Sequence, residues 1–117
     1  MNKFKRSSPE LVSLFTEIME AFECDRRIIF GYPAYFLKGN MFASLFADKV
    51  IFRIPLSSKD GLMQRYSKLE AFEPMKGRIM KEYLAVPDAL HEKKKFLKDM
   101  IVGAYEYAES LPAKKKH

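Results

Sequence analysis

Hydrophobic periodicity predicts a helix near each end of the chain. Residues 9–22 carry apolar side chains at intervals of three and four, the spacing of one helical face. Ser8 is the expected N-cap, and Pro9 suits the first helical position, where its missing N–H costs nothing. The same spacing predicts a long helix over about 92–110, ended by Pro112. Its expected core face comprises Leu97, Met100, Ile101, Ala104, Ala108 and Leu111.

The segment between these helices is rich in aromatic and β-branched residues, which favour strands. The predicted strands are 28–30, 34–37, 42–47 and 50–54, with turns at Lys38-Gly39-Asn40 and at Asp48-Lys49. Strands joined by such short turns must be antiparallel, so this region predicts a meander of three or four strands. The stretch 34–37 carries no charge, and an uncharged edge strand would favour pairing with a second copy of the chain.

A short helix and one further strand are predicted after the meander. Ser57 and Asp60 have the spacing of a capping box, which predicts a helix over 57–69. Pro74 and Gly77 indicate a loop, and 79–86 reads as a last strand. The fold class predicted from the residues is therefore a small α+β domain, with a meander plus a later strand packed by the terminal helices. The 117 residues are expected to form a single domain (1–117), ordered over about 8–111 with disordered basic termini.

The net charge of +6 is concentrated at the termini. Removing six terminal cations from the 21 basic residues leaves 15, which equals the 15 acidic residues, so the body 7–113 is neutral. The six cations are Lys3, Lys5, Arg6, Lys114, Lys115 and Lys116. No apolar run approaches the roughly 20 residues of a membrane span, so no membrane partner is expected. A lone cysteine, Cys24, fits a reducing compartment, and the cytoplasm is the expected location.

The sequence offers no catalytic, metal-binding or cofactor-binding constellation, so we expect none and do not expect an enzyme. Cys24 would be a nucleophile only if the fold brought His91 to it, and packing is the favoured role for Cys24. The other histidine, His117, lies in the lysine-rich tail. Lys76, Gly77 and Arg78 form a candidate anion or nucleic-acid contact, because backbone N–H groups near a glycine can surround an anion. The simpler reading of that loop is a turn with solvated cations.

The aromatic residues of the predicted sheet also have two readings. They could stack on nucleic-acid bases, as on some RNA-binding sheets, or pack in the core beneath the helices. Because side chains alternate between the faces of a strand, core packing is favoured. The set comprises Tyr32, Tyr35, Phe36, Phe42, Phe46 and Phe52.

Two segments, 30–43 and 72–83, together resemble the N-terminal domain of the TfoX/Sxy family of bacterial competence regulators and their small single-domain relatives. The first contains a Phe-Gly-x-Tyr stretch, then a turn and Met-Phe-Ala; the second contains Phe-x-Pro, then Gly-Arg-x-Met-x-x-Tyr. The family-motif positions are Phe30, Gly31, Tyr32, Gly39, Met41, Phe42, Gly77, Arg78, Met80 and Tyr83.

This resemblance implies a two-layer α+β sandwich, a homodimer, and a non-enzymatic interaction module acting as an accessory in transcription. The longer regulators of the family carry a second, helical domain after this one, and the resemblance leads us to expect that these 117 residues correspond to the stand-alone members. The alternative function is weak, direct binding of nucleic acid through the basic termini and the Lys76-Gly77-Arg78 loop. Such binding would be independent of sequence and sensitive to salt.

Overall fold

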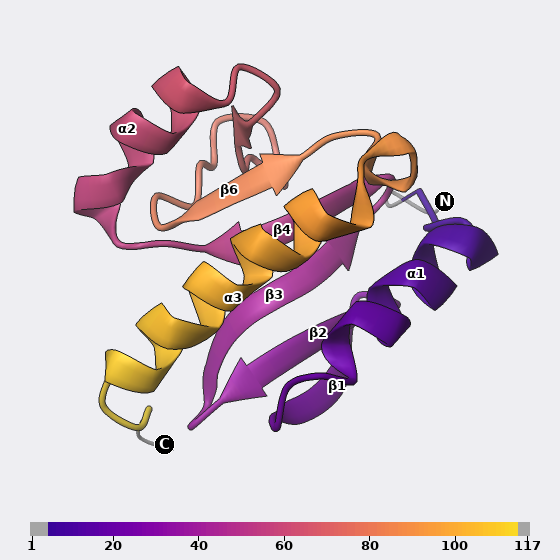
Figure 1. The fold of residues 1–117 in the computed structure, drawn as a ribbon, viewed down its shortest axis with the longest axis horizontal. Helices are drawn as coiled ribbons and strands as arrows, with labels where there is room; N and C mark the ends of the chain where they lie inside the picture. The colour runs from indigo at the N-terminus through magenta and orange to yellow at the C-terminus, as the bar shows by residue number, and fades with distance from the viewer. Residues whose placement is uncertain (1–4, 115–117) are drawn as a thin grey trace.

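The computed structural model describes residues 5–114. It confirms the predicted α+β sandwich: an antiparallel six-stranded sheet in the order β1-β2-β3-β4-β6-β5, covered by helices (Figure 1). The helical elements are α1 (Pro9–Met19), α2 (Leu56–Arg65), the 3-10 turn η1 (Ala89–His91) and α3 (Lys94–Ser110). The strands are β1 (Asp25–Ile29), β2 (Tyr32–Leu37), β3 (Asn40–Phe46), β4 (Lys49–Arg53), β5 (Glu70–Ala71) and β6 (Tyr83–Val86).

The predicted meander is confirmed, with strands β1 to β4 joined by tight turns. Backbone φ is positive at both turn residues of the first two hairpins: 54° and 85° at Phe30-Gly31, and 53° and 82° at Lys38-Gly39. Paired positive φ angles give the turn whose twist matches that of the flanking strands. Phe30 was expected to end a strand and instead lies in the turn, while Lys38 rather than Asn40 takes the left-handed conformation.

The predicted boundaries were wrong at several other elements. The third turn lies one residue earlier than expected, with φ of 54° at Ala47. Helix α2 begins at Leu56 after Pro55, with no side-chain cap, so Ser57 lies inside the helix and the expected capping box does not form. Strand β6 is confined to 83–86 rather than 79–86, since residues 79–82 belong to the preceding loop.

The terminal helices match their predicted patterns closely. The Ser8 side chain accepts a hydrogen bond from the backbone N–H of Leu11 at 3.1 Å, as an N-cap should. The predicted core face of α3 is confirmed at Leu97, Ile101, Ala104 and Ala108, whereas Met100 is half-buried and Leu111 is the half-buried C-cap residue beyond the helix. Helix α1 stops at Met19 rather than at Phe22, which is still half-buried and packs against Tyr105, their ring centroids 5.1 Å apart.

A β-bulge in β3 decides which side chains face the helices. Tyr35 pairs with Ala43 and Phe36 pairs with Met41, which leaves Phe42 without a partner residue in β2. Phe42 and Ala43 consequently both join the core beneath the helices, and neither is exposed. The ring of Phe42 meets that of Tyr105 in α3 edge-on, with centroids 5.4 Å apart.

The two faces of the sheet are covered differently. Figure 1 shows α1 and α3 lying across one face, and side chains of α2 pack against the same core. We call this the helix face. The opposite face, which we call the open face, carries a smaller buried cluster of Ile51, Phe72, Tyr83 and Ala85. No helix contributes to that cluster; its cover comes from the loop that follows β5.

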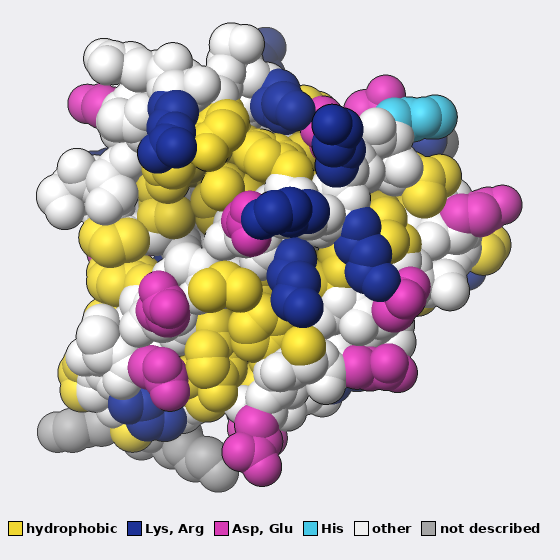
Figure 2. All heavy atoms as spheres, viewed as in Figure 1, with side chains coloured by type: hydrophobic (Ala, Val, Ile, Leu, Met, Phe, Trp, Pro, Cys, Tyr) yellow, Lys and Arg dark blue, Asp and Glu magenta, His cyan; other side chains and the backbone are white. Residues whose placement is uncertain are grey.

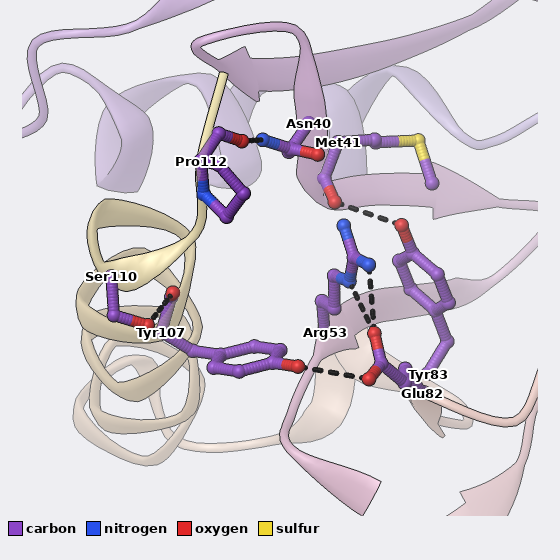
Figure 3. A network of polar contacts seen from close by, with 8 residues as sticks. All are labelled: Asn40, Met41, Arg53, Glu82, Tyr83, Tyr107, Ser110 and Pro112. Atoms are coloured by element: carbon purple, nitrogen blue, oxygen red, sulfur yellow. Dashed lines mark hydrogen bonds and ion pairs between the residues drawn. The ribbon is translucent and has the colours of Figure 1, made fainter. Parts of the chain in front are cut away.

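Both ends of the described chain are tied to the body by hydrogen bonds. The backbone N–H of Lys114 donates to the carbonyl of Lys38 at 2.9 Å, and the side-chain amide of Asn40 donates to the carbonyl of Pro112 at 3.0 Å (Figure 3). The Ser7 hydroxyl donates to the carbonyl of Ala47 at 2.7 Å. Ser7, Pro112 and Lys114, which make these contacts, lie just outside the range 8–111 that the sequence predicts to be ordered.

Alanine substitution at two turn glycines should separate backbone strain from close contact. Both Gly31 and Gly39 have positive φ, but a Cβ at Gly31 meets nothing within 4 Å, whereas one at Gly39 lies 3.1 Å from Cβ of Lys114. We expect Gly31→Ala to lower the free energy of unfolding by about 1 kcal/mol and Gly39→Ala by about 2 kcal/mol. Urea unfolding of both variants measures this. Equal losses would show that the Lys114 segment imposes no constraint on the turn.

Candidate interaction surface

A groove lies on the open face, between the β1–β2 turn and the loop 72–80. Strand alternation places small and apolar side chains on its floor, because Ala34 pairs with Ser44 and Phe36 with Met41 on the same side of the sheet as Ile51. The hollow over this floor has a volume of about 280 Å³. Its remaining walls are Ile29, Phe30, Tyr32, Leu45, Phe46, Phe72, Pro74 and Met80.

A second hollow of about 330 Å³ adjoins the first. The two share Phe30, Phe46, Pro74 and Met80, so together they form one elongated depression. Arg78 lines the second hollow. Among the described residues that line the two hollows, it is the one that carries a charge. Ser44 lies on the floor of the first hollow and is 6% exposed. Among the described residues, it is the one polar residue that is buried.

The rim of this groove is unusually apolar for a protein surface. Phe30 of the β1–β2 hairpin is 73% exposed and lines both hollows, and Met75 of the loop is 59% exposed and lines the second. Exposed apolar side chains scattered singly are normal, but a group gathered around a depression is typical of an interaction site. Five of the seven large exposed hydrophobic residues of the described chain lie in these two segments: Ile28, Ile29, Phe30, Met75 and Ile79.

Cations stand beside the groove without acidic partners among residues 5–114. The guanidinium of Arg27 lies over the ring of Phe36, its carbon 4.5 Å from the ring centroid. Arg78 and Lys76 are exposed on the loop. None of the three forms an ion pair with a described residue. Several lysines of the helix face, by contrast, pair with carboxylates, as Lys94 does with Glu17 at 2.7 Å.

The structure shows how the Lys76-Gly77-Arg78 loop is built. The N–H of Arg78 donates to the carbonyl of Met75 at 2.8 Å, and Gly77 has φ of 82°, which closes a tight turn. The carboxylate of Glu73 accepts a hydrogen bond from the N–H of Gly77 at 2.5 Å. The N–H that was the candidate anion donor is therefore held by the chain's own carboxylate, while the two cationic side chains remain exposed.

The two motif segments of the sequence meet at this groove. Phe30, Tyr32 and Met41 of the first segment line it together with Met80 of the second, and Arg78 lines its extension. A further contact ties the segments together, since the hydroxyl of Tyr83 donates to the carbonyl of Met41 at 2.8 Å (Figure 3). Gly31 and Gly39 lie in the first two hairpin turns, and Gly77 lies in the turn of the loop 72–80. Phe42 is the bulged residue of β3.

The aromatic set divides between the two faces. Tyr35, Phe42 and Phe52 belong to the buried core beneath the helices, as the core-packing interpretation predicted for these positions. Phe36 and Phe46 lie instead on the open face, where Phe46 packs edge-on against Phe72 with centroids 5.3 Å apart. No alternation pattern could have revealed this groove, because the strands are apolar on both faces and the cover of each face depends on distant segments.

Cys24 and His91 lie far apart. The hydroxyl of Tyr105 donates to the carbonyl of Glu23, beside Cys24, whereas His91 precedes the start of α3. Tyr105 is eleven residues beyond Lys94, about 16 Å along the helix. Burial, and then the charge of Asp25, raise the pKa of the Cys24 thiol, which disfavours the thiolate. Within residues 5–114, no three of the His, Cys, Asp and Glu side chains are grouped so as to hold a metal ion.

A polar network fastens the end of β4 to β6 and α3 (Figure 3). Arg53 donates to one carboxylate oxygen of Glu82 from Nε at 2.9 Å and from Nη2 at 2.7 Å. The hydroxyl of Tyr107 donates to the other oxygen at 2.8 Å. Burial alone would raise the pKa of Glu82, but the hydrogen bonds from Arg53 and Tyr107 and the charge of Arg53 bring it below its ordinary value. This network is structural, since every group in it is satisfied by another.

The chain matches no protein-family model, and no curated protein or solved structure is significantly similar to it. Among the residues that the structure describes, no helix has the length and apolar character needed to cross a membrane. Clues to the function of the chain therefore come from the open face of its sheet.

Substituting Glu82 should give a stability loss that depends on pH. Because the folded-state pKa of Glu82 is below its unfolded value, the carboxylate stabilises the fold above about pH 4.3 and the stabilisation disappears as pH falls through the folded pKa. We expect Glu82→Gln to cost about 1 kcal/mol at pH 7 and almost nothing near pH 3. Glu17→Gln, in an exposed pair, is the control and should cost less than about 0.5 kcal/mol. Thermal unfolding across this pH range measures both; a pH-independent loss in Glu82→Gln would contradict the ion-pair explanation.

Proposed function

We propose that this protein is a non-enzymatic interaction module that binds another protein through the open face and the adjoining edge strand β1. The observation that carries the proposal is the exposed apolar rim, formed by the β1–β2 hairpin and the loop 72–80 around a preformed groove. Water leaves such a rim when a partner covers it, which favours association by the hydrophobic effect.

Strand β1 offers a second means of contact, because one of its edges is unpaired. It is the first strand in the sheet order, and all five of its residues are exposed. An extended segment can add to such an edge through main-chain hydrogen bonds. The other edge strand, β5, has two residues and offers much less.

A second copy of the chain is one candidate partner. The uncharged stretch 34–37 was expected to be an edge strand that pairs with a second copy. It lies instead inside the sheet, between β1 and β3, so self-pairing would have to use β1. Charges limit the register: pairing centred on Arg27 would set two arginines opposite each other. Pairing centred between Arg27 and Ile28 sets each arginine opposite an isoleucine and avoids that repulsion.

The proposed setting is an accessory role in transcription regulation, which follows from the resemblance to TfoX/Sxy N-terminal domains. What supports it here is the convergence of both motif segments on one surface. The role in transcription is proposed from the resemblance, and the expected ligand of the chain is a partner protein rather than a substrate.

Weak binding of nucleic acid is the second candidate. It is favoured by the exposed cations Arg26 and Arg27 on β1 and by Lys76 and Arg78 on the loop. Arg26 is partly engaged, since its Nε donates to the Tyr35 hydroxyl at 3.2 Å. Contacts of this kind would be with phosphates and would carry no sequence preference.

Self-association through β1 can be tested by charging its edge. Light scattering of the full chain at micromolar concentration should give the mass of a dimer. Ile28→Lys should give a monomer, because a lysine on an edge strand opposes pairing. The matched control is Leu56→Lys, since Leu56 is 54% exposed and Ile28 56%, and it should stay dimeric.

A monomeric wild-type chain would refute self-association but not binding of another protein. In that case, affinity capture from native lysate should recover a protein that Ile28→Lys fails to recover. Repeated capture that enriches nothing over that variant would contradict the interaction module itself.

Nucleic-acid binding, if it occurs, should weaken steeply with salt. Contacts from the six terminal cations together with Lys76 and Arg78 to duplex DNA would give a slope of log affinity against log salt near −7. A double variant with Lys76→Gln and Arg78→Gln should reduce the magnitude of the slope by about 2 if both side chains meet phosphates. Fluorescence anisotropy with duplexes of unrelated sequence measures this. Tight binding that prefers one sequence would contradict the proposed mode.

A further inference from the structure

We propose that the groove on the open face recognises an acidic segment of a partner protein that inserts one large apolar side chain. This inference rests on the proposed function and specifies the partner's chemistry. Two features of the groove determine it: the shape and lining of the first hollow, and the unbalanced positive charge beside it.

The first hollow has the size and lining for a single anchor side chain. Its volume is about 280 Å³, and Ala34 on its floor is fully buried and small, which leaves depth above the sheet. The walls are apolar apart from the Ser44 and Tyr32 hydroxyl groups. A buried aromatic or long aliphatic side chain in such a hollow typically dominates the energy of a protein interface.

The exposed rim favours a protein segment over a small molecule. Phe30 on one side and Met75 on the other are each more than half exposed. A small ligand held in the hollow would leave both in water. An extended segment that crosses the groove would cover both sides at once and remove their apolar surface from solvent.

The charges beside the groove favour acidic residues next to the anchor. Arg27 lies over Phe36 on the β1 side, and Arg78 lines the second hollow on the loop side. Glu73, the acidic residue nearest in this loop, already accepts the Gly77 N–H. Arginine binds carboxylates through two parallel hydrogen bonds, and near an apolar rim such bonds are less weakened by water. Carboxylates on both sides of the anchor would therefore meet a cation on each side of the groove.

The chain's own N-terminus is the alternative occupant of the groove, and a binding test must distinguish it from a partner protein. The hydroxyl of Tyr32, a wall residue, donates to the carbonyl of Lys5, the first described residue. Residues 1–4 lie outside the described range and include an apolar residue, Phe4. The full-length chain and a Phe4→Ala variant should accordingly be compared in every binding measurement.

The experiment is a selection of random 12-residue peptides displayed on phage against the immobilised full-length chain. Enriched peptides should share one Phe, Leu, Met or Trp with Asp or Glu within three positions. A synthetic peptide of the enriched sequence is then titrated by fluorescence anisotropy. Arg78→Glu and Arg27→Glu should each weaken its binding at least tenfold, and Ser44→Leu, which fills the hollow, should do the same. Lys98→Glu, an exposed helix-face cation, is the charge-matched control and should change nothing.

Thermal unfolding of each variant confirms that a loss of binding is not a loss of fold. Enriched peptides that lack acidic residues, or binding indifferent to Arg78→Glu, would overturn the acidic partner. If those peptides still lose binding in Ser44→Leu, the proposed function stands while this inference fails. Peptides sensitive to neither Ser44→Leu nor Ile28→Lys would count against both. Tenfold tighter binding to Phe4→Ala would show that the N-terminus is the resident of the groove and would also overturn the inference.

Discussion

The structure depends on one constraint: a six-stranded sheet has two faces, and the chain has long helices for only one of them. The alternation of β4 makes this concrete. Val50 and Phe52 point into the core beneath α1 and α3, while Ile51 between them points to the opposite side and is equally buried. A side chain on that side must be covered by whatever else the chain can supply, or it would be left in water.

The chain meets this constraint with the loop 72–80 rather than with a helix. Phe72 and Met80 of the loop pack against the Ile51 cluster, and Phe72 also contacts Phe46 in β3. The cover reaches β4 and β6 but leaves the floor over β2 and β3 beneath a hollow. The bulge in β3 moves Phe42 to the helix face, so Met41 rather than Phe42 lies beside Ser44 on the open face. The groove is thus a consequence of unequal coverage.

Local signals in the sequence predicted the elements that depend on neighbouring residues. Ser8 and Pro9 define a helix start by their own chemistry, Gly39 permits a left-handed turn, and the apolar spacing in α3 identifies its buried face. The errors have non-local causes. Ser57 had the right spacing for a cap, but Pro55 takes the N-cap position two residues earlier. The segment 79–82 had strand-like composition, but it belongs to the loop that covers the open face. The groove itself joins positions far apart in sequence, such as Ala34 and Met80, and no local pattern relates them.

The distribution of charge follows the same division between faces, and it bears on the kind of partner. On the helix face, where Figure 2 shows Lys and Arg side chains gathered over α3, several lysines pair with carboxylates, as in Lys68–Glu92 and Lys95–Asp99. On the open face, Arg27, Lys76 and Arg78 have no such partner among the described residues. The cations Arg27, Lys76 and Arg78 outnumber the acidic residues of β1 and the loop 72–80, Asp25 and Glu73, so a small excess of positive charge lies beside the groove. Phosphates alone would pair with those cations but would leave the apolar rim exposed to water. A surface that combines unpaired guanidinium groups with exposed isoleucine and methionine is better matched by a polypeptide, which can bring carboxylates and apolar side chains to it together.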